Sequence, residues 1–162
     1  MTSTDATSTA HSAYRERLTP SLWAFVSAAV VAPMAAMVFV PFDKTVALAA
    51  GVVVAVLVIA LLIAAAPRVE VRGAELRAGR AHIPVAALGE AEPFAGEDAR
   101  QLRGPGLQRD AWHLIRGGID GLIQVPVTDP QDPTPVWVIS SRTPDRLAAA
   151  IRRAQRAASA TV

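Results

Sequence analysis

The 162-residue chain contains no cysteine, which excludes disulfide frameworks and cysteine-ligated zinc or iron–sulfur sites. Aromatic residues make up only 5% of the chain and charged residues 19%, against about 25% charged in a typical soluble domain. The shortage of charge is concentrated in one segment. Residues 21–66 hold 38 apolar residues out of 46, whereas residues 67–162 hold 40 out of 96. This division excludes an ordinary soluble globule.

Two runs, residues 21–40 and 45–66, contain no charged residue. About 20 helical residues, at 1.5 Å per residue, cover the roughly 30 Å hydrocarbon core of a bilayer. Apolar residues surround each predicted helix, which is typical of a helix in lipid. We therefore predict a transmembrane helical hairpin over residues 20–66, with spans at about 21–40 and 45–66 and a short turn between them.

The Lys/Arg bias predicts the orientation of this hairpin. The turn carries only Lys44, which Asp43 offsets, whereas the outer flanks of both spans are rich in arginine. The flanking arginines are Arg15, Arg17, Arg68, Arg72, Arg77 and Arg80. We therefore expect a two-span protein of the cell membrane with both termini in the cytoplasm.

Neither predicted span contains Asp, Glu, Lys, Arg or His, the groups on which ion paths and proton relays usually depend. A self-sufficient transporter or channel is therefore not expected.

Pro33 is predicted to kink the first helix. Small residues recur every fourth position, and this spacing indicates either close helix packing, a dimer seam or the chance result of an alanine-rich composition. These residues are Ala28, Ala32, Ala36, Ala47, Gly51 and Ala55.

Residues 1–19 are predicted to form a disordered N-terminal tail followed by a juxtamembrane segment. The first 13 residues are rich in Thr, Ser and Ala without periodicity. Tyr14 and Trp23 suit the headgroup level of a membrane, where amphipathic rings settle. The alternative is that Glu16 and its arginine neighbours dock onto the domain that follows the spans.

Residues 67–162 are predicted to form a small mainly-β cytoplasmic domain closed by a helix over residues 144–158. Thr143 is a suitable N-cap, Pro144 suits the first helical position, and Leu147, Ile151 and Ala154 form an apolar stripe. Short alternating segments with Gly and Pro between them indicate seven strands. These segments are residues 69–71, 75–78, 81–85, 88–94, 111–115, 122–127 and 136–140.

This order of elements resembles the bacterial pleckstrin-homology-like (PH-like) fold, a barrel or roll with a C-terminal α-helix. The likeness lies in the entry hairpin at residues 67–79, the strand at Ile83-Pro84 leading into Leu88-Gly89-Glu90, and the last strand before Thr143. More closely, the segments at residues 14–18, 75–79 and 128–135 resemble those of a family of small actinobacterial membrane proteins of unknown function. That resemblance covers about residues 14–156 and implies a membrane protein, with no activity attached.

The residues that carry the closer resemblance fall in three places. They are the segment 14–18 ahead of the spans, the segment 75–79, and the proline-rich segment 128–135 that leads to the Trp137 strand and the last helix.

Residue types that support catalysis or metal binding are present without a matching pattern. His11, His82 and His113 lie in no ligand spacing. Asp129 and Asp132 precede prolines, as ordinary turn residues do, and lack the spacing of a calcium loop. Glu90 and Glu92 suit a solvated strand. We therefore expect no catalytic residues, no cofactor and no metal, and so no enzyme.

Arginine is the residue type that suggests a physical partner. From residue 67 onward the chain has 13 Arg and 11 acidic residues, without the dense clusters and interleaved aromatics of a nucleic-acid site. Basic groups beside an anionic leaflet each contribute about 1 kcal/mol of attraction. The candidate membrane-surface contacts are Arg15, Arg17, Trp23, Arg68, Arg72, Arg152, Arg153 and Arg156, and the alternative is a simply solvated basic face.

The leading functional hypothesis is a non-enzymatic, membrane-anchored interaction module that presents the PH-like domain to a protein partner. The alternative is an accessory subunit of a membrane transporter or a cell-envelope enzyme complex. The lipid bilayer and a protein are the expected partners, nucleic acid is not, and a homo-oligomer remains open.

Overall fold

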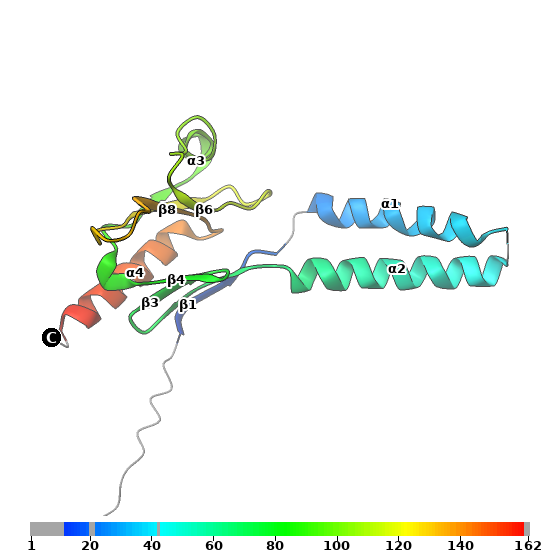
Figure 1. Ribbon diagram of the computed structural model, residues 1–162, viewed down its shortest axis with the longest axis horizontal. Coiled ribbons are helices and arrows are strands. Elements are labelled where there is room, and N and C mark those ends of the chain that lie inside the picture. The colour runs from blue at the N-terminus through cyan, green and yellow to red at the C-terminus, as the bar shows by residue number, and fades with distance from the viewer. Residues whose placement is uncertain (1–11, 20–21, 42, 161–162) are drawn as a thin grey trace, which may run out of the picture. The chain divides into compact units, whose positions relative to one another are not determined.

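The computed structural model describes residues 12–19, 22–41 and 43–160, and the tail predicted for residues 1–11 lies outside them. The chain divides into two compact units. One unit contains two long helices, and the other contains the strands and the C-terminal helix (Figure 1).

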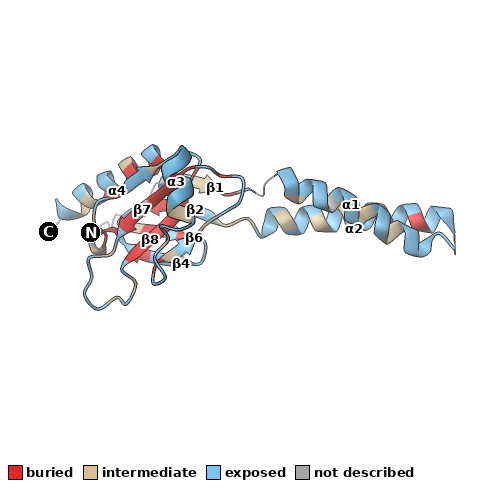
Figure 2. Cartoon of the chain, turned by 90° about the horizontal axis from the view of Figure 1, so that it is seen from above, coloured by how far each residue is buried: buried red, intermediate tan, exposed pale blue. Residues whose placement is uncertain are grey.

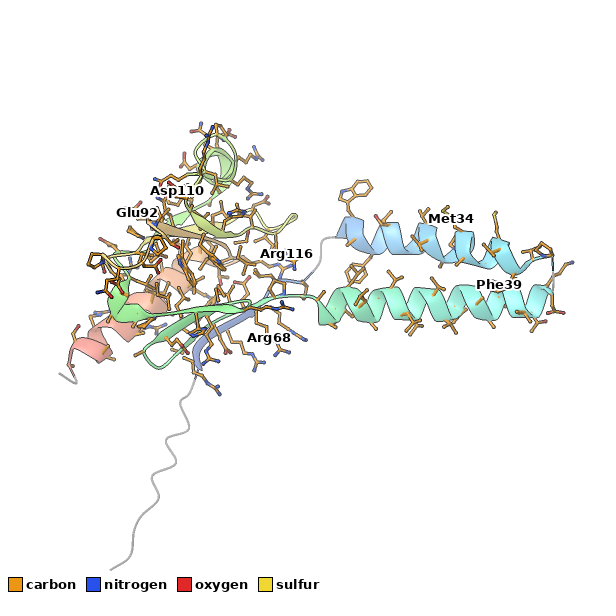
Figure 3. The ribbon with its side chains drawn as sticks, in the orientation of Figure 1. Met34, Phe39, Arg68, Glu92, Asp110 and Arg116 are labelled. Atoms are coloured by element: carbon orange, nitrogen blue, oxygen red, sulfur yellow. The ribbon has the colours of Figure 1, made fainter. Side chains whose placement is uncertain are left out.

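The long helices α1 (Leu22–Phe39) and α2 (Lys44–Ala64) lie antiparallel, side by side (Figure 1). Both are long and apolar enough to cross a membrane, and their ends lie within two residues of the predicted spans. Helix α1 continues through Pro33. Apolar side chains, with Met34 and Phe39 labelled, extend from both helices (Figure 3), and most of the helical surface is exposed (Figure 2).

Small residues lie at a close approach of the two helices. A Cβ atom added to Gly51 of α2 would lie 3.1 Å from the Cβ of Ala36 and 3.3 Å from the carbonyl oxygen of Ala32, both in α1. Ala47, one turn before Gly51, is also buried. The small-residue spacing therefore packs the hairpin at this point, as one of the sequence interpretations predicted.

Asp43 caps the N-terminal end of α2. Its carboxylate accepts hydrogen bonds from the backbone N–H groups of Thr45, at 2.6 Å, and Val46, at 3.1 Å. These two bonds hold the pKa of Asp43 below its usual value, and the bond from Val46 has the larger effect. The cap satisfies two of the N–H groups that the first helical turn leaves without partners.

A strand that the sequence analysis missed precedes the hairpin. β1 (Ser12–Arg17) lies beside β2 (Arg68–Arg72) in the first sheet, so the two helices are inserted between neighbouring strands. The backbone N–H of Leu18 donates to the carbonyl of Pro67 at 3.0 Å, which brings the two ends of the insertion together. The sequence analysis assigned no strand to residues 12–17, whereas the structure pairs them with β2.

The first sheet has the order β1-β2-β3-β4, with β3 (Glu75–Ala78) and β4 (Ala81–Pro84) continuing an antiparallel meander. Its registers place Val71 opposite Leu76, and Leu76 opposite Ile83. These side chains are buried on the inner face, together with Val69 and Ala78. The outer face carries charged residues in alternation, as the sequence pattern predicted.

The second sheet has the order β5-β7-β8-β6. It consists of β5 (Glu92–Phe94), β6 (Trp112–Leu114), β7 (Leu122–Pro126) and β8 (Val136–Ser140). β8 is buried along its whole length because it lies between two strands and is covered on both faces. Its pairing with β6 is parallel and places Trp112 beside Trp137, with ring centroids 4.2 Å apart.

The segment predicted as a strand over residues 88–94 is only partly extended. The 3-10 helix η1 (Val85–Ala87) precedes this segment, which itself contains an isolated bridge from Leu88 to Val127 and the short strand β5. The Nε2 atom of Gln155 lies 2.8 Å from the carbonyl oxygen of Leu88 and 3.1 Å from that of Gly89. The side chain of Gln155 thus donates to carbonyl groups that, in a longer strand, would accept hydrogen bonds from a neighbouring strand.

Two helices cover the β unit. Helix α3 (Gly96–Arg103) contributes Ala99 to a buried cluster with Leu122, Val136 and Val138. Helix α4 (Pro144–Ser159) contacts β2, β5, β7 and η1. Its stripe of Leu147, Ile151 and Ala154 is buried as predicted, and its bounds match the predicted helix within one residue.

We expect Gly121→Ala to destabilise the β unit. A Cβ atom at Gly121 would lie 2.5 Å from the carbonyl oxygen of Ser141 and 3.0 Å from the ring of Pro144, so the start of α4 would have to shift. Overpacking of this kind costs about 1–3 kcal/mol of unfolding free energy. Denaturant unfolding of the detergent-solubilised protein, followed by tryptophan fluorescence, measures this loss. Gly117→Ala is the matched control because nothing lies within 4 Å of a Cβ atom there. Equal stability of both variants would contradict the prediction.

Candidate functional site: an arginine-lined groove between β1 and α4

A hydrogen-bond network joins β1 to the start of α4. Oε2 of Glu16 accepts from the Tyr14 hydroxyl at 2.6 Å and from the Ser141 hydroxyl at 2.7 Å, and Oε1 accepts from the backbone N–H of Arg142 at 2.8 Å. Because the single phenolic proton of Tyr14 goes to Glu16, the Thr143 hydroxyl, 2.8 Å from Tyr14 Oη, is the donor there. We call this set of contacts the Glu16 network.

The Glu16 network explains two differences from the sequence analysis. Thr143 occupies the N-cap position of α4 without a side-chain capping bond, because its hydroxyl contacts Tyr14 instead. The docking of Glu16 onto the following domain, the alternative interpretation of this segment, is confirmed. The membrane-boundary role predicted for Tyr14 stays a prediction, and its half-buried hydroxyl contacts Ser141 and Thr143 of the β unit.

The pKa of Tyr14 is perturbed by its place in the Glu16 network. Burial raises the pKa of Tyr14 above its ordinary value of 10.0, and the hydrogen bond to the Glu16 carboxylate raises it further. The neutral phenol donates to the carboxylate, whereas a phenolate beside it would be a second negative charge in a partly desolvated place.

Beside the Glu16 network lies an open groove of about 720 Å³. One wall is formed by residues 13–16 of β1 and the other by Thr143 and the outward face of α4. We call it the arginine groove because five arginines and one carboxylate, that of Glu16, contribute its charged groups. These arginines are Arg15, Arg146, Arg152, Arg153 and Arg156.

The positive charge of the arginine groove is only weakly neutralised from within. Glu16 is already engaged by three donors. Arg15 lies 4.0 Å from Glu70, and Arg152 lies 3.9 Å from Glu90, both at the outer limit of an ion pair. No ion pair of Arg146, Arg153 or Arg156 occurs within residues 12–19, 22–41 and 43–160.

The eight predicted membrane-surface contacts therefore separate into two sets. Four of them line the arginine groove: Arg15, Arg152, Arg153 and Arg156. The other four lie elsewhere: Arg17 ends β1, Trp23 is exposed in the first turn of α1, and Arg68 and Arg72 lie on the outer face of the first sheet, with Arg68 labelled in Figure 3. Their contact with a membrane remains a prediction.

The outer face of the first sheet differs from the groove in its balance of charge. Arg72 lies opposite Glu75 and Arg77 opposite Glu70 in the strand registers, and Arg77 pairs with Glu75 at 2.6 Å. Acidic and basic groups thus alternate across this face, as on an ordinary solvated sheet. The arginine groove is the stronger candidate for binding an external anionic group.

Two acidic residues weighed as metal ligands serve as turn residues. The carboxylate of Asp129 accepts from the N–H of Gln131 at 2.9 Å, and that of Asp132 from the N–H of Thr134 at 2.8 Å. These are the short-range bonds by which Asp stabilises turns, so the turn interpretation is confirmed. Within the described part of the chain, no three His, Asp or Glu side chains gather in a metal-binding group.

Sequence reasoning missed Arg146 and Ser141 as parts of this region. Arg146 was not among the predicted membrane-surface contacts. Its spacing from Arg153 and Arg156 was the available signal, since positions seven and ten residues apart share one face of a helix. Ser141 gave no signal, because its partner Glu16 lies 125 residues earlier.

A hairpin of two apolar helices inserted into a mixed-sheet β domain with a C-terminal helix defines the class of this protein. A family described as "Protein of unknown function (DUF3093)" matches residues 13–151, so the match begins within β1 and ends within α4. The chain belongs to this family. No curated protein and no solved structure matches it.

We expect Tyr14 to ionise above pH 10, and since it is the only tyrosine of the chain its titration is directly observable. The folded state holds the phenolic proton more tightly than the unfolded chain. The stability that this provides is therefore present in full below pH about 10 and is lost as the pH rises through the folded pKa. Absorbance of the tyrosinate against pH measures the pKa, with Tyr14→Phe as the blank.

Glu16→Gln should lower the Tyr14 pKa toward its ordinary value and lower the unfolding free energy by about 1–3 kcal/mol, because a carboxylate with three donors is lost. Glu92→Gln is the matched control, since Glu92 is exposed on β5. A Tyr14 pKa that is the same in both variants would contradict the role assigned to Glu16.

Proposed function

We propose that this protein is an integral membrane protein whose helical hairpin crosses the bilayer and anchors a cytoplasmic PH-like domain. The domain binds a protein partner through the arginine groove and catalyses no reaction. Both termini lie in the cytoplasm.

The exposed apolar surface of the helices carries the membrane part of this proposal. Among the residues that the structure describes, every exposed large apolar side chain lies between Leu22 and Ile63. Leu22, Met37 and Leu61 are examples, with 81%, 72% and 69% of their surface exposed. Such a surface is costly in water at roughly 25 cal/mol per Å², and a bilayer removes that cost.

The distribution of charge supports the orientation. Asp43 and Lys44 lie at the N-terminal end of α2, next to the turn, and their charges offset each other. The arginines of β1 and β2 flank the opposite ends of the hairpin in the chain. The positive-inside rule then favours a cytoplasmic β unit.

The β unit supports the PH-like assignment and the role in binding. It has two four-stranded sheets and a final helix packed on them, the order of elements for which the PH-like fold was expected. The arginine groove is a charged concave surface of this unit, and its side chains suit recognition of carboxylates. A domain held at the membrane with such a surface is suited to recruiting a partner.

Single cysteines in this cysteine-free chain test the orientation. Lys44→Cys keeps the Asp43 cap and marks the turn, and Ala160→Cys marks the end of α4. In intact cells, a membrane-impermeant thiol reagent should label position 44 and not position 160, and after lysis it should label both. Labelling of position 160 from outside would contradict the proposed orientation, and protection of both positions in intact cells would contradict the hairpin.

A photo-crosslinking residue at position 149 tests the binding role. Ala149 lies within the arginine groove, and crosslinking in intact cells should repeatedly recover the same protein. The matched control is position 86, an exposed alanine in η1, which should not recover it. Recovery of lipid alone from position 149 would contradict a protein partner.

A further inference from the structure

The arginine groove follows the open edge of a β-strand. Ala13, Tyr14, Arg15 and Glu16 all line it, although consecutive residues of a strand point to opposite faces. All four can line one groove only when the groove runs along the edge of the strand, because the backbone groups of every residue are accessible from that edge. In the first sheet β1 is the terminal strand, with β2 as its neighbour. The backbone groups of such an edge are suited to pairing with a further strand.

The opposite wall carries a row of cations of matching length. Arg146, Arg153 and Arg156 span ten residues of α4, which is about 15 Å at 1.5 Å per residue. Side chains on one face of an extended chain recur about every 6.6–6.8 Å, so three of them span about 13 Å. An extended segment alongside β1 would therefore place alternate side chains along the row of arginines.

The charge of the groove defines the chemistry of those side chains. Arg146, Arg153 and Arg156 make no ion pair within the described ranges, and the one carboxylate of the groove, Glu16, is occupied by its three donors. Arginine pairs with carboxylates through two parallel N–H···O bonds, which are stronger than neutral hydrogen bonds. Acidic side chains at alternate positions complement this wall.

We propose that the arginine groove binds an extended acidic segment of a protein partner, which lies along β1 as an added strand with its acidic side chains directed at α4. This inference rests on the proposed function and specifies the partner for the same site. The strand edge distinguishes a peptide from a lipid headgroup, because a headgroup has no backbone to pair with β1.

Binding of synthetic peptides to the full chain in uncharged detergent tests the inference. The probe is a fluorescent peptide of alternating Thr and Glu, measured by anisotropy at low salt. Arg146→Gln combined with Arg153→Gln should weaken binding about tenfold to a hundredfold, because two charge-assisted contacts are lost. The matched control, Arg68→Gln with Arg72→Gln, removes the same charge from the outer face of the first sheet and should change binding less than threefold. Equal effects of the two double variants would overturn the inference.

Backbone methylation tests the added strand separately from charge. Two versions of the peptide carry N-methyl groups at odd or at even positions, and only one set of N–H groups can face β1. One version should bind about tenfold more weakly than the other, as expected from lost backbone hydrogen bonds. Equal binding of the two versions would overturn the strand-addition geometry.

A third comparison separates a peptide from a membrane surface. Vesicles with anionic lipid should not displace the peptide. If they do displace it, and if Arg146→Gln with Arg153→Gln abolishes this displacement, the groove would instead be assigned to lipid. These measurements use detergent-solubilised protein and do not depend on membrane orientation. Failure of the thiol-labelling experiment and failure of peptide binding are therefore distinct results.

Discussion

The carboxylate of Glu16 accepts hydrogen bonds from Tyr14, Ser141 and Arg142, and much of the arrangement of the β unit depends on this one set of contacts. A partly buried carboxylate is stable only when donors replace the water that it loses. Two of these donors, Ser141 and Arg142, come from the junction between β8 and α4. It therefore fixes β1 against the start of α4 and gives the arginine groove its second wall.

The large elements of the fold could be predicted because their signals are local. The two helices follow from uncharged apolar runs, and α4 follows from Pro144 and the stripe of Leu147, Ile151 and Ala154. The strands β2 and β3 follow from alternation, since Val69 and Val71 are buried between exposed neighbours. In each case the apolar residues that define the pattern are the ones that the structure buries.

β1 could not be predicted in the same way because its inward side chains are polar. Tyr14 and Glu16 face the network at the start of α4, where an ordinary half-buried strand would place apolar residues. Gln155 is a second example, since a polar side chain on α4 contacts the carbonyl groups of Leu88 and Gly89 and the predicted strand there is shortened. Both contacts are polar and far apart in sequence, and hydrophobic periodicity does not report either. The same reason limits the site: the arginines on one face of α4 follow from helical spacing, but their approach to Arg15 requires β1.

The insertion of the helical hairpin between β1 and β2 also determines an order of events during biosynthesis. β1 leaves the ribosome before either helix, and its neighbour β2 follows only after residues 18–67 have been made. Ser141, the partner of Glu16, follows 125 residues after it, and α4 is the last helix to emerge. Among the strands that the structure describes, β1 is thus synthesised first and is among the last to acquire all its contacts. A truncated nascent chain would expose β1 without its partners, so the burial of Tyr14 distinguishes a completed protein from an unfinished one.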